Sequence, residues 1–338
     1  MSVTIKDVAK ETGLAISTIS KYLNGGTVRE ENRKKIVTAI QQLNYVINPS
    51  ARQLRSARTY KIGILIGAAE NPYTASLLGE IEKKLREQGY AIIFAGQNLT
   101  PDGVLSFANF LLTQGVDGMI VWPTFVGLQS MALLRKKNVP VVMLEENWEK
   151  SPFDCAQVDC SRGTYEMADY LIQCKHEKIA MIAGPEGRTA ASERLNGYLR
   201  AMTDYCLPIR PGMVIHTDFS FHSGYKAMKK LWNLKERPTA VMTANYDLTQ
   251  GAMSAIAEEG ISIPDELSLI AYDDFELSRM VRPKLTAFRQ PVTLLADAAC
   301  QLLLDQITKG IPSKRRVIRI QGKIQYRDSV KNLEETPG

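Results

Sequence analysis

The sequence predicts an all-α helix-turn-helix headpiece followed by a two-lobed α/β core of doubly wound parallel sheets. Three observations indicate this architecture. Two short helices with turn signals lie near the N-terminus, strands alternate with helices from Lys61 onward, and the excess of positive charge is confined to the headpiece. With 338 residues, 45% of them hydrophobic, the chain has room for two or three domains with sizeable cores.

The first two helices are expected within TIKDVAKETGLAISTISKYLN, residues 4–24. Thr4 can cap the first helix, with Asp7 three residues later in capping-box position. Gly13 supplies the backbone freedom that a tight turn between helices needs. Asn24 and the two glycines after it end the second helix. This pattern is typical of a helix-turn-helix, and a plain pair of packed helices is the alternative.

The second helix has two different faces. Ile19 is expected to be buried, whereas Ile16, Ser17 and Lys21 form the opposite face. In a helix-turn-helix, side chains near the start of this helix meet base edges in the major groove. These three residues are therefore candidates for reading DNA sequence.

A third helix is expected after the segment TVRE, residues 27–30, which has the spacing of a second capping box. Ile36, Ile40 and Leu43 recur at helical spacing and form a stripe that would cover the first two helices. Arg33 lies beside this stripe, where it could reach backbone phosphates. Three short helices would give a compact headpiece.

The positive charge is unevenly distributed. Residues 1–58 carry ten Lys and Arg against four Asp and Glu, a net charge of +6 that equals the net charge of the whole chain. Acidic and basic residues are therefore balanced over residues 59–338. A charge run is often only a solvated face, but confinement of the entire excess to one small domain favours phosphate binding.

The segment NPSARQLRSARTYK, residues 48–61, connects the headpiece to the core. It is basic and poor in apolar groups, so alone it would be a marginal helix or a solvated linker. Its one large apolar residue is Leu54. A leucine on a basic helix could wedge between base steps in the minor groove. From composition alone, the solvated linker is the preferred interpretation.

From Lys61 the pattern is that of two α/β lobes with a ligand crevice at the carboxyl ends of the strands. The first lobe is expected to have strands at residues 61–68, 90–96, 116–123 and 139–145, with helices at 77–88, 104–114 and 128–137. The second is expected to have strands at 178–184, 213–217, 239–244 and 267–274, with helices at 163–173, 192–203, 223–231 and 248–259. A helix at 291–309 and strands within 315–327 complete the pattern.

Several classes of function find no support in the sequence. The five cysteines are odd in number and scattered, so a disulfide framework is not expected, and Cys155 with Cys160 makes a poor zinc site. No apolar run reaches the ~18 residues of a membrane span, and no apolar signal segment opens the chain, so a cytoplasmic location is expected. The three histidines fit no metal or nucleophile spacing. Phosphate-binding glycine loops and a nucleophile elbow are lacking, so no enzyme activity, metal or cofactor is expected.

These motifs together resemble the lactose-repressor/purine-repressor (LacI/GalR) family of bacterial transcription regulators. The resemblance extends from Thr4 to about Arg327. Its most specific pieces are the helix-turn-helix segment, NPSARQLR before KIGILI, RTAASERLNGYLRAM, TANYDLTQGAMSAI and LSLIAYDDFELSRMVRPKLTAFRQP. The family consists of homodimers that bind palindromic operators. Their DNA affinity changes when a small ligand closes a two-lobed core that is similar to periplasmic binding proteins.

The resemblance implies a hinge helix at residues 47–59, with Leu54 as the wedge and Arg55 beside it, and it reverses the preference for a linker. The hinge would become ordered when two copies meet on DNA. The implied divisions are residues 1–46 for the headpiece, 60–160 with 290–320 for the N-lobe, 161–289 with 321–330 for the C-lobe, and 331–338 for a tail. The expected DNA-contacting residues are Thr4, Ile16, Ser17, Thr18, Lys21, Asn24, Arg33, Ser50, Leu54 and Arg55.

The resemblance also implies an effector site in the core. Its expected residues are Tyr73, Thr74, Arg188, Arg194, Phe219, Asn245, Asp273 and Gln290. A carboxylate and amides for hydroxyl groups, arginine forks and an aromatic ring suit a sugar. Asp273 could instead cap a helix, and Phe219 could belong to the core. Arg194 carries the arginine of the family's R-x-x-G motif, retained here as RLNG.

Five positions depart from the family pattern. Ala15 stands where a serine or threonine usually caps the recognition helix, and Lys21 replaces an arginine that could bind guanine with two hydrogen bonds. Tyr246 replaces an aspartate, Thr74 replaces an aromatic residue, and Lys175 stands where a glycine usually precedes His176. The changes at Tyr246 and Thr74 bear on which effector binds.

The expected function is that of a repressor whose operator affinity is controlled by a small ligand. A solute-binding or sensor protein would share the core but would not need the basic headpiece. The sequence leaves open which ligand and operator are bound, whether the ligand releases or strengthens DNA binding, and whether a protein partner also controls the core.

Overall fold

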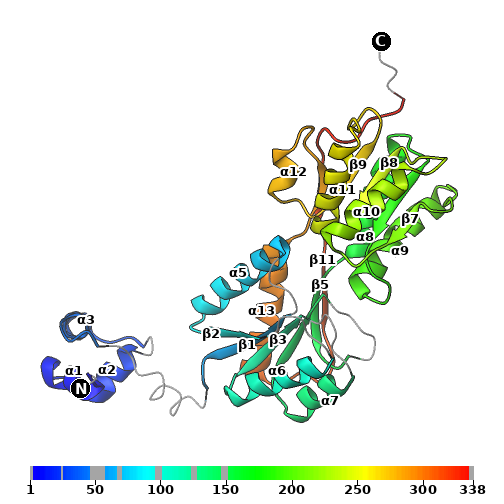
Figure 1. Cartoon of the computed structure of the whole chain (residues 1–338). Coiled ribbons are helices and arrows are strands. Elements are labelled where there is room, and N and C mark those ends of the chain that lie inside the picture. The colour runs from blue at the N-terminus through cyan, green and yellow to red at the C-terminus, as the bar shows by residue number, and fades with distance from the viewer. Residues whose placement is uncertain are drawn as a thin grey trace. The chain divides into compact units, whose positions relative to one another are not determined.

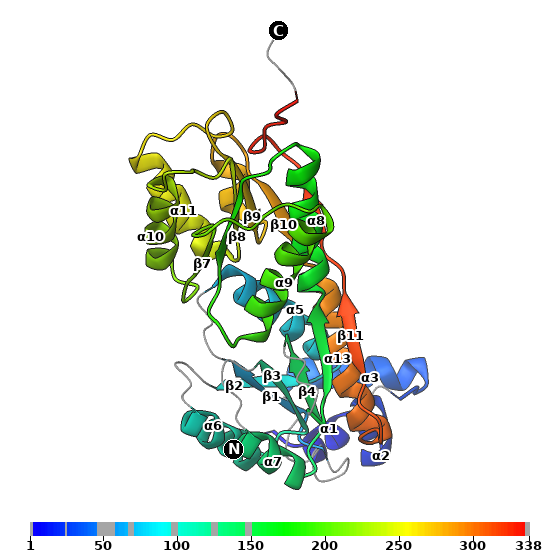
Figure 2. The same ribbon diagram turned by 90° about the vertical axis from the view of Figure 1, so that its right-hand side faces the viewer.

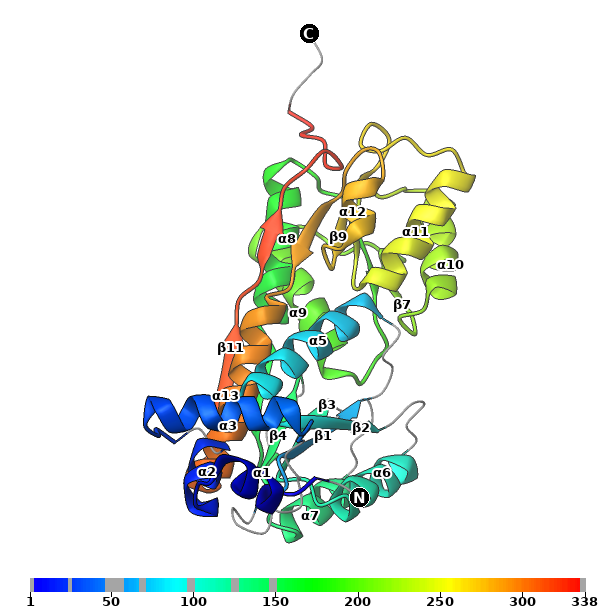
Figure 3. The same ribbon diagram turned by 90° about the vertical axis from the view of Figure 1, so that its left-hand side faces the viewer.

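The computed structural model describes residues 3–23, 26–45, 58–66, 71–95, 101–122, 128–145 and 151–334. The chain divides into two compact units, Met1–Tyr60 and Lys61–Gly338. Figure 1 labels the helices and strands of both units, and Figures 2 and 3 show the same ribbon from two further sides. The predicted order of a helical headpiece followed by an α/β core is confirmed.

The headpiece contains the three helices α1 (Ile5–Thr12), α2 (Ile16–Leu23) and α3 (Glu30–Gln42). The predicted capping box at the start of α1 is present, because Asp7 Oδ2 accepts hydrogen bonds from the backbone N–H and the hydroxyl of Thr4 at 2.8 and 2.7 Å. Gly13 ends α1 with a φ of 67°, and its N–H donates to the carbonyl of Ala9. This left-handed backbone needs glycine, as the sequence predicts.

A small apolar cluster holds the three helices together. Its buried members in the described residues are Val8, Ile19, Ile36 and Ala39, with at least one from each helix. Tyr22, Leu23, Ile40 and Leu43 are partly buried and pack against this cluster. The apolar stripe predicted for the third helix is therefore confirmed as the contact surface for the first two.

The capping box predicted at residues 27–30 is wrong. Helix α3 begins at Glu30, and its N-cap is Arg29, whose side chain makes no capping hydrogen bond. Arg29 has a ψ of 143°, so the chain is still extended there. Thr27 and Val28 instead line a pocket beside Tyr22. The threonine-to-glutamate spacing is present, but the helix starts too late for Thr27 to cap it.

The core unit contains two sheets, each with six described strands. The first sheet has the order β11-β5-β4-β3-β1-β2, and all its neighbours pair in parallel. Its strands are β1 (Lys61–Ile66), β2 (Ala91–Ala95), β3 (Gly118–Trp122), β4 (Val141–Leu144), β5 (Asp154–Val158) and β11 (Val317–Ile320). Its helices are α5 (Pro72–Glu87), α6 (Pro101–Thr113), α7 (Leu128–Lys136) and α13 (Val292–Lys309). Buried side chains of β1, β3 and β4 form its apolar core.

The second sheet has the order β12-β10-β9-β8-β6-β7. Its strands are β6 (Ile179–Ala183), β7 (Val214–His216), β8 (Ala240–Thr243), β9 (Ser268–Tyr272), β10 (Thr286–Arg289) and β12 (Lys323–Gln325). Its helices are α8 (Cys160–Gln173), α9 (Thr189–Asp204), α10 (Phe221–Trp232), α11 (Tyr246–Glu258) and α12 (Glu276–Met280). Strand β12 pairs antiparallel with β10, so this sheet is parallel except at one edge.

Within the described residues, the chain crosses between the two sheets three times. It passes from β5 to α8 at Asp159, from β10 to α13 at Gln290 and Pro291, and from β11 to β12 at residues 321–322. Figures 2 and 3 show these crossings side by side along one side of the core. The two sheets are therefore joined by a hinge of three chain segments and not by one flexible linker.

Strand β5, helix α12 and strand β10 were not predicted. Strand β5 carries Asp154 and Gln157, polar residues that do not suggest a buried strand, yet all five of its residues are buried. Asp154 is satisfied by Arg316, whose Nε and backbone N–H donate at 2.9 and 2.7 Å, and by the amide of Gln306 at 2.9 Å. A buried carboxylate is tolerated when it is paired in this way.

Most helices of the core begin two to five residues earlier than predicted. Asn71, Asp159, Ser220 and Asn245 each accept a backbone hydrogen bond at a helix N-terminus. The first turns of these helices are polar or contain proline, so the apolar periodicity begins only after the helix has started. Side-chain capping therefore sets these boundaries, and hydrophobic spacing does not detect it.

Lys175 stands where helix α8 ends and has a φ of 68°. Its N–H donates to the carbonyl of Ile172, and the N–H of His176 donates to the carbonyl of Leu171, which together form a Schellman motif. A side chain is disfavoured at this left-handed position, which explains why the related family usually has glycine there.

Replacing Lys175 with glycine is expected to stabilise the core by about 0.5–1 kcal/mol, because it relieves the left-handed backbone of a Cβ atom. The ion pair from Lys175 to Glu334 is exposed at both ends, so its loss costs little. Thermal unfolding of the variant measures the gain. Lys175→Ala removes the same ion pair but keeps the Cβ atom, and an equal gain in that control would contradict the backbone explanation.

Candidate nucleic-acid interface and effector site

Helix α2 presents the predicted reading surface to solvent. Ile16, Ser17 and Lys21 are exposed, with Ile16 at 37%, and Thr18 is partly exposed. Ile19, on the opposite side of the same helix, is fully buried. The headpiece core therefore fixes the orientation of α2 and leaves a polar, positively charged surface that can enter a groove.

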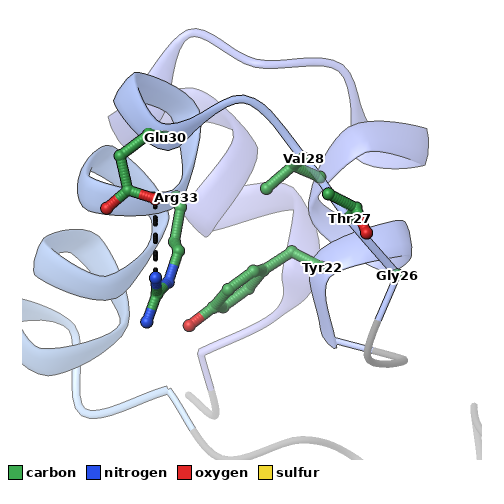
Figure 4. Close-up of a pocket in the computed structure, with 6 residues that line it drawn as sticks. All are labelled: Tyr22, Gly26, Thr27, Val28, Glu30 and Arg33. Atoms are coloured by element: carbon green, nitrogen blue, oxygen red, sulfur yellow. Dashed lines mark hydrogen bonds and ion pairs between the residues drawn. The ribbon is translucent and has the colours of Figure 1, made fainter.

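A pocket lies beside this helix, lined by Tyr22, Gly26, Thr27, Val28, Glu30 and Arg33 (Figure 4). The guanidinium of Arg33 donates to Glu30 at 3.4 Å, and both side chains are more than half exposed. An exposed ion pair of this kind contributes little. Arg33 can therefore exchange Glu30 for a backbone phosphate at small cost.

Of the other predicted DNA contacts, the structure describes only Thr4. Thr4 is exposed and caps α1. Asn24, Ser50, Leu54 and Arg55 lie outside the described residues. The DNA-contacting set and the hinge helix therefore remain predictions.

In the core, Arg194 on α9 is the centre of the predicted effector site. Its side chain is only 6% exposed, and Nη1 donates to the carbonyl of Ala244. The guanidinium carbon lies 3.8 Å from the ring centroid of Tyr272 and 5.9 Å from that of Phe219. The guanidinium therefore lies against the Tyr272 ring, with the Phe219 ring farther away.

Close packing of α8 and α9 positions this arginine. A Cβ atom on Gly197 would lie 2.2 Å from the carbonyl oxygen of Ser161, so only glycine allows the two helices to approach this closely. Arg194 and Gly197 are the first and last residues of the RLNG motif. The arginine is the candidate ligand residue of this motif, and the glycine allows the helix contact beside it.

Phe219 and Asn245 lie next to each other. The Phe219 ring occupies the space above Gly184, where a Cβ atom would come within 2.1 Å of the ring. Asn245 caps α11 by accepting the N–H of Leu248 at 2.9 Å, and its amide donates to the carbonyl of Phe219 at 3.2 Å. Both groups of Asn245 therefore already have partners within the protein.

Asp273 and Gln290 form a buried polar pair, 4% and 6% exposed. The amide of Gln290 donates to Asp273 Oδ1, and the N–H of Tyr246 donates to Asp273 Oδ2 at 3.1 Å. Burial raises the pKa of Asp273, although Arg194 opposes the shift. Among the described residues, Gln290 Oε1 and Arg194 Nε are buried and have no hydrogen-bond partner. Such atoms are unfavourable unless a ligand or water satisfies them.

Tyr73 joins this site to the first sheet. Its side chain is buried in the first turn of α5, and its hydroxyl donates to Glu145 Oε1 at 3.0 Å. Glu145 follows strand β4 and also accepts the N–H of Val158 at 3.2 Å. Burial raises the pKa of Glu145 to about 7, against the attraction of Arg194.

Glu145, Cys160 and Tyr272 also lie around Arg194, although the sequence did not single them out. The thiol of Cys160 lies at the start of α8, and burial raises its pKa to about 11. The sequence contains one indication for Glu145. It ends a predicted strand, and ligands bind at the carboxyl ends of parallel strands. Nothing in the local pattern indicates that Tyr73 would reach it.

The two remaining predicted effector residues are Thr74 and Arg188. Thr74 is buried within α5. Arg188 is the N-cap residue of α9 and is half-buried, and burial lowers its pKa. The structure thus brings together Arg194, Phe219, Asn245, Asp273 and Gln290, while ligand contact itself stays a prediction for all eight residues.

The described residues contain no candidate metal site and no candidate membrane span. No group of three or more His, Cys, Asp and Glu side chains there could hold a metal ion. Nor does any helix among them combine the length and apolar content needed to cross a membrane.

Comparison with known proteins identifies both units. Residues 4–48 match the model of bacterial regulatory proteins of the lacI family, and residues 168–330 match a periplasmic binding protein-like domain. The chain is 32% identical over 336 residues to the HTH-type transcriptional repressor PurR of Actinobacillus pleuropneumoniae, which covers 98% of this chain and 99% of the relative. The chain belongs to the LacI family.

Solved structures of LacI-family proteins agree with this assignment. The lac repressor dimer bound to operator and the anti-inducer ONPF superposes with a TM-score of 0.83 at 25% identity, covering 98% of this chain and all of that one. A LacI-family regulator from Enterococcus faecium with bound ribose gives 0.72 at 27% identity, covering 81% and 99%. The family consists of transcription regulators, so this LacI-family chain is not an enzyme.

The buried carboxyl of Glu145 makes stability depend on pH. Its pKa is raised from an ordinary 4.5 to about 7, so the folded core holds this proton more tightly than the unfolded chain does. Its contribution to the free energy of unfolding therefore falls as the pH rises from about 4.5 to 7. Thermal unfolding of Glu145→Gln should lose this part of the pH dependence. Glu87→Gln, an exposed control on α5, should keep it, and identical profiles for the wild type and Glu145→Gln would contradict the assignment.

Proposed function

We propose that this LacI-family chain is a transcriptional repressor that binds a palindromic operator as a homodimer and acts in the cytoplasm. Full-length similarity to HTH-type repressors supports this proposal, as does similarity to the lac repressor dimer on its operator. The net charge of +6 carried by residues 1–58 supplies the attraction to phosphates. Residues 1–46 would act as the reading headpiece and residues 47–59 as the hinge, with Leu54 wedged at the operator centre.

We further propose that a small ligand bound in the core controls operator affinity. The observation that carries this proposal is the pair of buried atoms without partners, Arg194 Nε and Gln290 Oε1. They lie in a site that also has the rings of Phe219 and Tyr272 and the carboxylate of Asp273. A guanidinium, an amide and a carboxylate around aromatic rings suit a polar ring compound.

A sugar is the first candidate for this ligand. Hydroxyl groups of a sugar can both donate to Gln290 Oε1 and Asp273 and accept from Arg194. The LacI-family relative with bound ribose agrees with this choice. By linkage, a sugar that weakens operator binding must itself bind less tightly to the operator-bound protein.

Lys21 and Arg33 are expected to have separable roles on DNA. Lys21→Ala should cost about 1–3 kcal/mol and relax specificity at one base pair of each half-site, because the lysine faces the base edges. Arg33→Ala should weaken binding to all sequences and reduce the salt slope by about one, because the arginine contacts phosphate. In vitro selection from random duplex DNA, followed by binding at several salt concentrations, measures both effects. A specificity change in Arg33→Ala would reverse these assignments.

The effector class can be tested by thermal unfolding against sugars, sugar phosphates, nucleosides and purines, since a ligand of the native state raises the melting temperature. A sugar is expected to give the shift. Arg194→Lys should then bind that sugar about 10- to 100-fold less tightly, because lysine cannot keep both the aromatic stacking and the hydrogen bonds of a guanidinium.

Arg200→Lys is the matched control for this experiment. Arg200 lies on the same helix and stacks on Tyr165 at 4.4 Å, but it faces solvent. It should leave sugar affinity unchanged. A shift with purines or nucleosides alone would keep the proposed regulator but overturn the sugar.

A further inference from the structure

A hydrogen bond joins the two lobes of the core far from the hinge. The amide nitrogen Nδ2 of Asn71 donates to Asp247 Oδ2 at 2.9 Å. Asn71 precedes α5, which packs with the first sheet, and Asp247 lies in the first turn of α11, which packs with the second sheet. The two residues are 176 positions apart in the chain. This bond therefore holds the lobes together directly.

Both residues are fixed by other interactions of their own helices. Asn71 Oδ1 accepts the N–H of Tyr73 at 2.9 Å and thereby caps α5. The cap does not use Nδ2, so this atom can donate to the other lobe. Asp247 follows Tyr246, whose N–H is bound by Asp273. Asn71 is thus bonded to one candidate effector residue, Tyr73, and Asp247 directly follows a residue bonded to another, Asp273. The bond thus connects lobe closure to Tyr73 on one side and Asp273 on the other.

Helix dipoles favour a carboxylate at this point. The N-terminal ends of α5 and α11 are brought together by this bond, and each carries a partial positive charge. Without a negative group between them, the two ends would repel each other. The Asp247 carboxylate removes that repulsion and adds a charge-assisted hydrogen bond. Asparagine or alanine at both positions would let the two helix ends approach each other but would not offset their partial positive charges.

We propose that Asn71 and Asp247 form an interlobe latch that holds the core closed in the absence of ligand. The inference rests on the proposed function, because it concerns how the same two-lobed site is regulated. With the latch formed, a ligand enters only after the bond opens, and the bond forms again behind it. A population that is already closed also lowers the ligand binding energy that closure requires.

The latch can be tested by exchanging donor and acceptor. Asn71→Asp keeps the cap of α5, because aspartate also accepts the Tyr73 N–H, but it places a second carboxylate against Asp247. Asp247→Asn alone keeps an acceptor oxygen for Asn71. The double variant Asn71→Asp with Asp247→Asn restores the bond with the donor on the other lobe. We expect Asn71→Asp to lower the closed-to-open ratio by about tenfold or more. Asp247→Asn alone should lower it less, because the bond stays but loses its charge, and the double variant should remain closed.

The distance between the lobes is the measurement. Spin labels on the exposed native Cys206 of the second lobe and on Lys83→Cys of α5 report it by pulsed electron resonance. The labelled chains are diluted with unlabelled protein, so that pairs within one chain dominate. Circular dichroism and thermal unfolding verify that each variant is folded. Asn71→Ser keeps a cap, but its side chain is shorter and has no amide to reach Asp247, so it gives a second opened variant.

An unchanged distance in both Asn71→Asp and Asn71→Ser would overturn the latch. Opening in Asn71→Asp that Asp247→Asn does not reverse would also overturn it, because the effect would then come from α5 alone. The experiment uses neither effector nor operator. A negative result therefore leaves the proposed repressor intact, and failure to find a sugar or an operator does not affect the distance measurement.

Discussion

The three crossings of the chain between the two sheets are the constraint on which the rest of the core depends. They restrict the lobes to movement about one edge, and two of them bring site residues with them. Gln290 lies in the crossing from β10 to α13, and Cys160 starts α8 directly after the crossing from β5. Any rotation of the lobes must therefore move Cys160, which packs with the second sheet, relative to Glu145, which follows a strand of the first. Gln290 belongs both to a crossing and to the candidate effector site, which couples the two.

The polar groups at this junction are costly to bury, and the structure compensates for only part of that cost. Asp274 is compensated by charge, because burial would raise its pKa but Arg327 and Arg289 hold it below its usual range. Glu145 and Asp273 are not, and burial raises the pKa of both. Asp274 is thus paired as a structural carboxylate is, whereas raised pKa values such as those of Glu145 and Asp273 are typical of functional sites.

The order of helices and strands follows from hydrophobic spacing, because each lobe alternates strands and helices of ordinary length. The boundaries do not follow, since residues such as Asn71 and Asp159 start helices through hydrogen bonds to the backbone. Strand β5 was missed because two polar residues are buried there, and one of them, Asp154, is satisfied by Arg316, more than 150 positions away. The error at residues 27–30 has a similar origin: the local spacing suits a cap, but Arg29 is still extended.

The candidate site was predicted mainly through the resemblance to a family and only in part from the residues. Arg194, Phe219, Asn245, Asp273 and Gln290 come from separate segments, and no local pattern shows that they meet. Glu145 was missed because one acidic residue at a strand end is an ordinary feature. Its role becomes visible only when Tyr73, 72 positions earlier, reaches it. Long-range contacts of this kind are what a single sequence does not contain.

The small apolar core of the headpiece has a consequence for folding. Its described core has only four fully buried apolar residues, Val8, Ile19, Ile36 and Ala39, and so small a cluster provides a few kcal/mol at most. The larger core, with its two sheets, does not share this weakness. The headpiece should therefore melt as a separate unit at a lower temperature. Operator DNA, which binds only the folded headpiece, would act as its main stabiliser and make DNA reading and headpiece folding one coupled event.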